Sequence, residues 1–278
     1  MIAPGSPPSG PGPSARPRPP VCLTTRWLGR PCLFVGTVES TNDEARRHLA
    51  KLGPGAHGAA FFTDDQRSGR GRHGRTWVSQ PGAALALSIS LWPRDAQAGP
   101  LSLLPVAASA AVVLALRDLC GLEAALKWPN DVLVAGRKVS GALLEAAWKG
   151  EAHSGLVLGV GVNLLQEESD WPADLRDRAA SIRSLGGSPP PLEVLVGHLL
   201  GRMEPLLEAC FEGARGLLHR VGALWIHREG DMLEVRAGGE TGVGAFLGIG
   251  PDGELVLAVA GEERRVRFGD VERLRRRP

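Results

Sequence analysis

The chain has 278 residues, and its 32 Lys and Arg side chains against 30 Asp and Glu give a formal net charge of only +2. Apolar residues make up 43% and charged residues 22%, proportions typical of a soluble globular protein with one large domain or two smaller ones. The near-balance of charge argues against a general nucleic-acid coat, which carries a marked excess of cations.

Proline dominates the N-terminal segment. The first twenty residues hold eight Pro and no acidic residue, so they cannot bury enough apolar surface to offset the entropy lost on ordering. They lack the apolar core of a secretory signal, and repeated proline disfavours the amphipathic helix of an organellar transit peptide. We therefore predict a disordered tail over residues 1–32, with organellar targeting as the alternative.

Residues 33–222 show the alternation of strand and helix patterns expected of an α/β domain. Thr41 and Glu44 match a capping box, which predicts the start of a short helix that closes at Gly53. Residues 58–63 predict a strand that runs into a Gly/Arg-rich stretch.

The second half of this domain continues in the same way. Period-two alternation predicts a strand over residues 85–91. Residues 101–119 predict a buried helix, because their apolar run of 16 residues is shorter than the roughly 20 that a membrane span needs. Residues 132–147 predict a hairpin, residues 156–163 a strand, and residues 192–210 a helix with one apolar stripe.

From about residue 223 the pattern changes to short apolar runs separated by glycine-containing turns. Such a meander predicts a small all-β domain over residues 223–278. The four cysteines are scattered without a CxxC pair, which favours a reducing, cytoplasmic environment. The seven His show no metal-ligand spacing, so we expect no metal-binding residues.

Gly69 to Gly74 satisfies the dinucleotide-binding pattern G-x-G-x-x-G, but a strand rather than a helix follows it, which argues against that function. Three arginines remain in the loop: Arg70, Arg72 and Arg75. Glycine lets backbone N–H groups approach an anion closely, and arginine supplies forked, permanently charged donors. The stretch therefore predicts a phosphate-binding loop, with a flexible solvated hairpin tip as the alternative.

Lys127 begins the sequence Lys-Trp-Pro-Asn-Asp and is one of only four lysines in the chain. Against this arginine-rich background, a lysine at the end of a strand indicates a need for a compact point charge. Such a charge could neutralise a carboxylate that must approach a phosphate. The alternative is a strand-edge lysine with Asn130 and Asp131 as ordinary turn residues.

Three weaker signals leave their interpretation open. Ser40-Thr41-Asn42 fits a helix cap or a ligand contact, and Gln66 alone indicates nothing. Gly159 and Gly161, before Asn163, mark either a strand end where a ligand touches bare backbone or a bulge.

Taken in order, these segments resemble the biotin protein ligases, the biotin–[acetyl-CoA-carboxylase] ligases. The resemblance runs from about residue 33 to the C-terminus. It rests on five segments: Ser40-Thr41-Asn42, GRGRHGRTW at 69–77, KWPND at 127–131, KVSGALLE at 138–145 and GVGVN at 159–163. It implies an α/β (α+β) fold in which residues 33–222 form a mixed-sheet catalytic domain like that of class II aminoacyl-tRNA synthetases. Residues 223–278 would form an SH3-like β-barrel.

The resemblance also implies a two-step reaction. Biotin and ATP would form biotinyl-5′-AMP with the help of Mg²⁺, and a lysine of the biotin carboxyl carrier protein of acetyl-CoA carboxylase would then accept the biotinyl group. The enzyme would work in the cytoplasm as a monomer or homodimer, with no membrane and no specific nucleic acid as a partner.

By the same resemblance, Lys127 and Arg72 are the expected catalytic residues. The expected biotin-binding residues are Ser40, Thr41, Asn42, Gln66, Arg70, Gly71, Arg72, Lys127, Gly141, Gly159 and Gly161. The expected ATP- and adenylate-binding residues are Arg70, Arg72, Arg75, Trp77, Lys127, Asn130 and Asn163.

Some ligases of this family carry an N-terminal helix-turn-helix and act as repressors. The proline-rich residues 1–32 cannot form one, so we expect no transcriptional role. A lipoate or octanoate ligase is the nearest alternative, although the Arg-x-Ser-Gly-Gly-Gly stretch of that family is absent. A nucleic-acid-binding protein that uses the arginine loop and the Arg-rich C-terminus is the alternative from another class.

Overall fold

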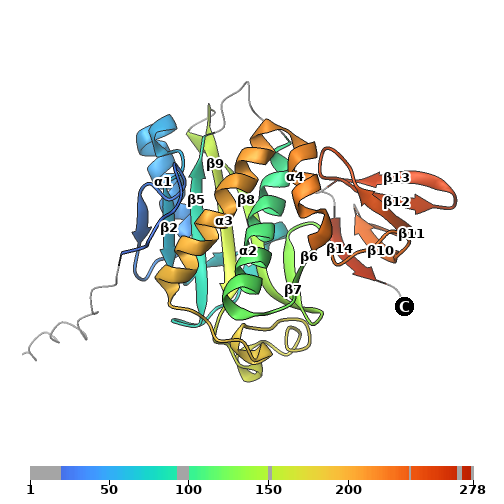
Figure 1. Cartoon of the computed structure of the whole chain (residues 1–278), viewed down its shortest axis with the longest axis horizontal. Helices are drawn as coiled ribbons and strands as arrows, with labels where there is room; N and C mark the ends of the chain where they lie inside the picture. The colour runs from blue at the N-terminus through green and yellow to red at the C-terminus, as the bar shows by residue number, and fades with distance from the viewer. Residues whose placement is uncertain (1–19, 93–99, 150–151, 238, 268–270, 277–278) are drawn as a thin grey trace, which may run out of the picture.

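The computed structural model describes residues 20–92, 100–149, 152–237, 239–267 and 271–276. Over these residues the chain forms a large mixed β-sheet in the centre of the molecule and a smaller antiparallel sheet towards the C-terminus (Figure 1). Helices pack against the large sheet, which confirms the predicted α/β architecture.

Seven strands build the central sheet: β1 (Cys32–Phe34), β2 (Ala60–Thr63), β5 (Ala84–Leu91), β6 (Ala124–Lys127), β7 (Asp131–Val134), β8 (Arg137–Lys149) and β9 (Ala152–Asn163). Their order across the sheet is β1–β2–β5–β9–β8–β7–β6. β1 pairs with β2 in parallel, and the other neighbours are antiparallel. Ala135 and Gly136 have φ values of 49° and 78° at the turn between β7 and β8, which confirms the predicted hairpin.

Helices lie on both faces of this sheet. They are α1 (Thr41–Leu52), α2 (Leu104–Cys120), α3 (Leu192–Glu212) and α4 (Ala214–Val221). Along β5, Leu87 and Ile89 join the core formed with α2 and α3, whereas Ser88 and Ser90 alternate with them and face α1. The Ser90 hydroxyl donates to the carbonyl of Ala45 in α1 at 3.1 Å. One face of the sheet is therefore covered by α2 and α3, and the other is left to α1 and to a cavity.

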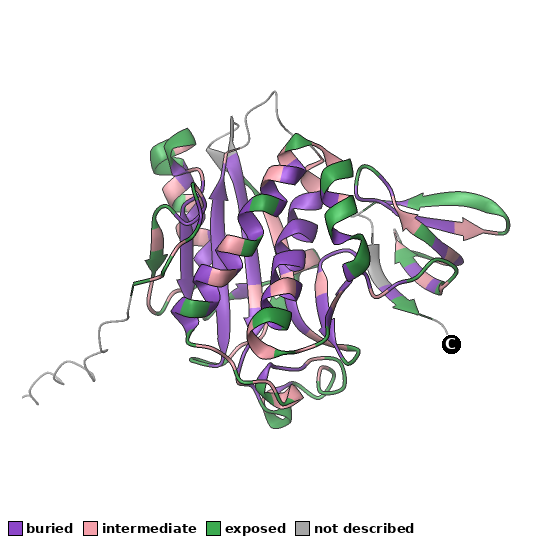
Figure 2. Ribbon diagram, in the orientation of Figure 1, coloured by how far each residue is buried: buried purple, intermediate pink, exposed green. Residues whose placement is uncertain are grey.

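The core lies between the central sheet and the pair α2–α3, where strands and inner helix faces are buried (Figure 2). The helical stretch Leu101–Cys120 is the one among the described residues that is long and apolar enough to cross a membrane. Most of it is buried inside the protein, as expected of a core helix.

Five antiparallel strands form the smaller sheet, in the order β13–β12–β11–β10–β14. They are β10 (Met232–Ala237), β11 (Glu240–Ile249), β12 (Leu255–Val259), β13 (Glu262–Val266) and β14 (Val271–Arg276). The turn between β11 and β12 contacts the central domain, where the Trp128 indole donates to the carbonyl of Gly253 at 2.8 Å. Trp128 is completely buried, so this bond fixes the small sheet beside the Lys-Trp-Pro-Asn-Asp turn.

Residues 20–32, which the sequence assigned to a disordered tail, pack against α3. The Glu204 carboxylate accepts the backbone N–H groups of Arg26, Trp27 and Leu28 at 2.8, 2.9 and 2.8 Å. Leu28 is completely buried. This corrects the predicted boundary, because a carboxylate 178 residues away in sequence satisfies these backbone donors. Residues 1–19 of the predicted tail lie outside the described residues.

His227 lies at the junction between the two sheets and is only 5% exposed. Its ring packs against Phe246 with centroids 5.7 Å apart. Burial, reinforced by the positive charge of Lys127, lowers the pKa of this imidazole from 6.5 to about 4. The folded protein therefore holds His227 neutral over a pH range in which the unfolded chain protonates it.

We expect acid to destabilise the fold through this residue. As the pH falls from about 6.5 towards 4, the unfolded state gains a proton on His227 that the folded state does not, so the free energy of unfolding decreases by up to about 3 kcal/mol. Denaturant unfolding of wild type and His227→Phe at pH 7 and pH 4.5 checks this. The variant should lose less stability on acidification, whereas the exposed His219→Gln control should match wild type; equal losses in all three proteins would contradict the assignment.

Candidate active site

A cavity of about 410 Å³ opens on the face of the central sheet that α2 and α3 leave free. Its floor is formed by β5, β8 and β9, and its walls come from the start of α1, the turn between β6 and β7, and a short hairpin of β3 (Gly69–Arg70) and β4 (Thr76–Trp77). Leu274 and Arg275 of β14 also reach it. All the predicted site residues line this cavity.

One end of the cavity is neutral and rich in hydrogen-bonding groups. Gln66 Oε1 accepts from the backbone N–H of Thr41 at 2.9 Å and lies 3.2 Å from its hydroxyl. The buried Ser88 hydroxyl lies 2.7 Å from the Thr41 hydroxyl and donates to Asn42 Oδ1 at 2.5 Å. This network holds amide and hydroxyl groups in fixed positions, as recognition of a polar, uncharged ligand head requires.

Ser40, rather than Thr41, caps α1. The Ser40 hydroxyl accepts the N–H of Asn42 at 3.3 Å, and Thr41 is the first helical residue. The helix cap therefore lies one residue before the predicted position, and it is a single side-chain bond rather than the predicted capping box. Because the cap is made by Ser40, the side chains of Thr41 and Asn42 are free to bond at the cavity.

The three glycines expected to admit a ligand lie against protein atoms in this structure. A Cβ on Gly159 would lie 2.5 Å from Asn42 Oδ1, and one on Gly161 would lie 2.5 Å from Cε2 of Trp77. A Cβ on Gly141 would lie 3.0 Å from Nζ of Lys138. Glycine at these positions lets three cavity-lining side chains approach the strands.

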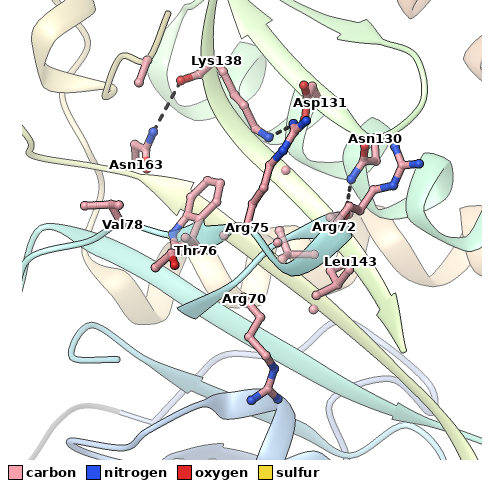
Figure 3. A pocket seen from close by; sticks show the side chains of 18 of the residues that line it. Arg70, Arg72, Arg75, Thr76, Val78, Asn130, Asp131, Lys138, Leu143 and Asn163 are labelled. Atoms are coloured by element: carbon pink, nitrogen blue, oxygen red, sulfur yellow. Dashed lines mark hydrogen bonds and ion pairs between the residues drawn. The ribbon is translucent and has the colours of Figure 1, made fainter. Parts of the chain in front are cut away.

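The β3–β4 hairpin carries the Gly/Arg stretch as a tight loop. The N–H of Gly71 donates to the carbonyl of Arg75 at 2.7 Å and closes it. Arg70 points away from Arg72 and Arg75 (Figure 3). It forms a bidentate pair with Asp43 of α1 at 2.7 and 3.2 Å.

The other end of the cavity gathers cations. Seven of the described residues that line the cavity are cationic, and Asp131 is the one carboxylate among them. Six of the cations gather at this end, whereas Arg70 turns towards α1; the six are Arg72, Arg75, Lys127, Lys138, Arg178 and Arg275. Asp131 is itself paired with Lys138 Nζ at 2.5 Å (Figure 3). This excess of positive charge in a concave, half-buried site favours an anion.

Burial changes the acid–base properties of two of these cations. Desolvation lowers the pKa of Lys127 below its usual value, and the positive charges of Lys138, Arg275 and Arg178 add to the effect. Asp131 opposes it. Desolvation likewise lowers the pKa of Arg72. An anionic ligand would relieve the repulsion among these groups.

Two predicted site amides are occupied by the protein itself. Asn130 donates to the carbonyl of Ala142 across the turn. Asn163 donates to the carbonyl of Ala180 at 2.9 Å. Both side chains are more than 90% buried, so they brace the cavity wall.

Several residues at the site were not predicted from the sequence. Ser88 and Glu145 lie inside strands, where alternation gives no sign of a ligand contact. Arg178 and Arg275 line the cavity from a loop and from the second sheet. No sequence signal distinguishes Ser88, because Ser90 alternates with the leucines of the same strand in the same way and bonds to the carbonyl of Ala45 instead.

Comparison with known proteins bears on the family. A model described as the Biotin/lipoate A/B protein ligase family matches residues 37–163. A biotin–[acetyl-CoA-carboxylase] ligase of Paracoccus denitrificans is 35% identical over 241 residues, which cover 81% of this chain and 92% of that relative. A Mycobacterium tuberculosis protein of the same name is 32% identical over 249 residues, covering 87% and 88% of the two chains. The chain belongs to the biotin protein ligase family.

Solved structures agree with this biotin protein ligase assignment. The biotin protein ligase from Aquifex aeolicus, solved in complex with biotin and ATP, superposes with a TM-score of 0.73 at 27% identity. The match covers 88% of this chain and 98% of that one. The resemblance inferred from the five sequence segments is confirmed.

The cavity does not contain a ready-made metal site. Among the described residues, no three His, Cys, Asp or Glu side chains are grouped so that they could hold a metal ion. Mg²⁺ usually keeps several waters and binds through one or two carboxylates together with substrate phosphates. Asp131 is the one lining carboxylate that could join such a site, and it would have to share its oxygens with Lys138, its partner at 2.5 Å.

Proposed function

We propose that this protein activates biotin with ATP and transfers it to a lysine of a biotin carboxyl carrier protein. The observation that supports this most is the polarity of the cavity. A neutral hydrogen-bonding pocket at one end suits the ureido head of biotin, and a cluster of cations at the other suits the carboxylate and the phosphates of ATP.

The first step joins two anions. The biotin carboxylate oxygen attacks the α-phosphorus of ATP, the bond to the bridging oxygen of pyrophosphate breaks, and biotinyl-5′-AMP forms. Lys127 and Arg72 offset the repulsion between the carboxylate and the phosphate and hold the reacting atoms in line. Mg²⁺, held by the phosphates and Asp131, would neutralise charge on the leaving pyrophosphate.

In the second step the neutral amine of the carrier lysine attacks the carbonyl carbon of the mixed anhydride, and AMP leaves. Between the two steps, this chain has to protect the mixed anhydride from water until the carrier protein binds. The Gly/Arg loop supplies that cover, with Gly71, Arg72 and Arg75 over the adenylate and Trp77 beside it.

The site residues keep the roles that the resemblance implies. The residues that serve biotin are Ser40, Thr41, Asn42, Gln66, Arg70, Gly71, Arg72 and Lys127, with Gly141, Gly159 and Gly161 shaping its pocket. The residues that serve the nucleotide are Arg70, Arg72, Arg75, Trp77, Lys127, Asn130 and Asn163, the two amides by bracing the wall.

The same proposal extends to the finer architecture. Residues 33–222, with residues 20–32 packed on them, form a catalytic domain like that of class II aminoacyl-tRNA synthetases, and residues 223–278 form an SH3-like β-barrel. The five antiparallel strands of the small sheet support the barrel, although among the described residues its edge strands β13 and β14 do not pair with each other. The enzyme acts in the cytoplasm as a monomer or homodimer.

Transfer to a carrier tests the function. Purified protein is incubated with biotin, ATP, Mg²⁺ and a biotin carboxyl carrier domain, and the carrier is analysed by intact mass. We expect one biotinyl group on one lysine, and none on a carrier in which that lysine is arginine. Modification by lipoate or octanoate in place of biotin would favour the alternative ligase.

A further inference from the structure

Four charged side chains next to the neutral pocket form a closed ring of alternating sign. Asp43 and Arg46 come from α1, Arg70 from β3 and Glu145 from β8. Arg46 donates to Asp43 at 2.6 Å and to Glu145 at 3.2 Å. Arg70 closes the ring, with Asp43 at 2.7 Å and Glu145 at 3.5 Å.

Glu145 also lies behind the uncharged lining of this pocket and bonds to one of its amides. Its Oε2 accepts from Nδ2 of Asn42 at 2.5 Å. The other side of this amide, Oδ1, accepts from the Ser88 hydroxyl and lies over Gly159, where a Cβ would be 2.5 Å away. Asn42 is therefore held in one orientation, with its donor fixed by Glu145 and its acceptor by Ser88.

We propose that Glu145 is a positioning residue that couples the hydrogen-bonding pocket around Thr41 and Asn42 to the Gly/Arg loop. One carboxylate group fixes the Asn42 amide through Oε2 and draws the Arg70 guanidinium through Oε1. Arg70 immediately precedes the loop that Gly71 and Arg75 close. The loop is thus tied to the pocket whose ligand it has to cover.

The solvent exposure of these four charged side chains indicates whether replacing Glu145 should affect stability or ligand retention. The side chains of the four members are 23–36% exposed, and ion pairs with this much access to water contribute little to stability. Removing the charge of Glu145 should therefore leave the fold almost unchanged. Its effect should appear in the position of the loop and in the retention of the ligand.

Two substitutions separate the two contacts of Glu145. Their kinetic readouts rest on the proposed function. Glu145→Gln keeps an oxygen for Asn42 and removes the charge that draws Arg70, so KM for biotin should stay within about threefold while biotinyl-AMP escapes about tenfold faster. Glu145→Ala removes both contacts, so KM for biotin should also rise about tenfold. The turnover number for adenylate formation should change less than KM in both variants.

The matched control is Glu44→Gln. It breaks the pair between Glu44 and Arg47 at 2.8 Å, on the outer side of helix α1, which also carries Asp43 and Arg46. It should leave KM for biotin and adenylate release at wild-type values. The positioning role is overturned if Glu145→Gln and Glu145→Ala both stay within about twofold of wild type for both quantities.

A second measurement needs no activity. Trypsin cleaves after arginine, and the loop offers Arg72 and Arg75. In the ligand-free protein, Glu145→Gln should be cut in this loop at least severalfold faster than wild type or Glu44→Gln, because the tie at Arg70 is weakened. Equal cleavage rates would overturn the coupling. Wild-type protein that forms no biotinyl-AMP would instead overturn the proposed function, and cleavage would still test the tie.

Discussion

Replacing Lys127 with alanine should lower the rate of biotin-dependent ATP–pyrophosphate exchange by about 10²–10³-fold. Lys127 lines the cationic end of the cavity, where the carboxylate and the α-phosphate would meet. Its charge is more effective there than at the surface, because partial burial withdraws the ammonium group from water. The alanine variant lacks this ammonium group, so its positive charge no longer offsets the repulsion between the two reacting anions.

The control for this variant is Lys51→Ala, because Lys51 is an exposed lysine in the last turn of α1. It should retain wild-type exchange. Lys127→Arg should recover only part of the activity, since a planar guanidinium does not replace a compact ammonium group at a crowded site. Exchange by Lys127→Ala within about threefold of wild type would contradict the assigned role.

The lowered pKa of Lys127 adds a pH signature. The ammonium group loses its proton at a lower pH than an ordinary lysine, whose pKa is about 10.4. The value of kcat/KM for biotin should therefore decline on the alkaline side below that pH. Lys127→Arg should remove this decline, because arginine stays charged throughout the range.

Replacing Gly161, which is assigned to the biotin pocket, with alanine should also disrupt the nucleotide end of the site by displacing Trp77. A Cβ there would lie 2.5 Å from Cε2, 2.7 Å from Cζ2 and 3.0 Å from Cδ2 of Trp77. The atoms that the Cβ would meet belong to a rigid ring and not to the flexible end of a side chain. The whole indole of Trp77 and the β4 strand that carries it must therefore move. We expect KM for ATP to rise at least tenfold and stability to fall by about 1–3 kcal/mol.

Gly222→Ala provides the matched control, because a Cβ on Gly222 would meet nothing within 4 Å and its φ is −54°. Its KM for ATP should equal that of wild type, and its unfolding midpoint should equal or exceed that of wild type, because alanine at this helical φ reduces the entropy of the unfolded chain. Trp77→Leu combined with Gly161→Ala should restore stability by making room for the methyl group. A Gly161→Ala protein with unchanged KM and midpoint would show that Trp77 is not held against this strand.

The parts of the site carried by contiguous motifs were predictable from the sequence. The Gly/Arg loop and the Lys-Trp-Pro-Asn-Asp turn both line the cavity, as the resemblance to the biotin protein ligases implied. The β7–β8 hairpin followed from local turn chemistry in the same way. A hairpin turn is specified by the residues within it, so no contact with distant residues is needed to predict it.

Other parts depend on contacts between distant residues. Glu145 meets Asn42 across 103 positions of sequence, and only the order of strands in the sheet brings them together. Glu204 orders residues 26–28 across more than 170 positions, so the proline-rich composition of the N-terminus gave too long a tail. Even a motif shifted locally, since Ser40 took the cap expected of Thr41 and left Thr41 to the pocket.

Isotope exchange between labelled pyrophosphate and ATP, measured without any carrier protein, tests the central claim most directly. It reports formation of the acyl-adenylate and nothing later. We expect rapid exchange that depends on biotin, that is absent with lipoate or without any added carboxylic acid substrate, and that is largely lost in Lys127→Ala. Exchange that depends on lipoate and not on biotin would contradict the claim.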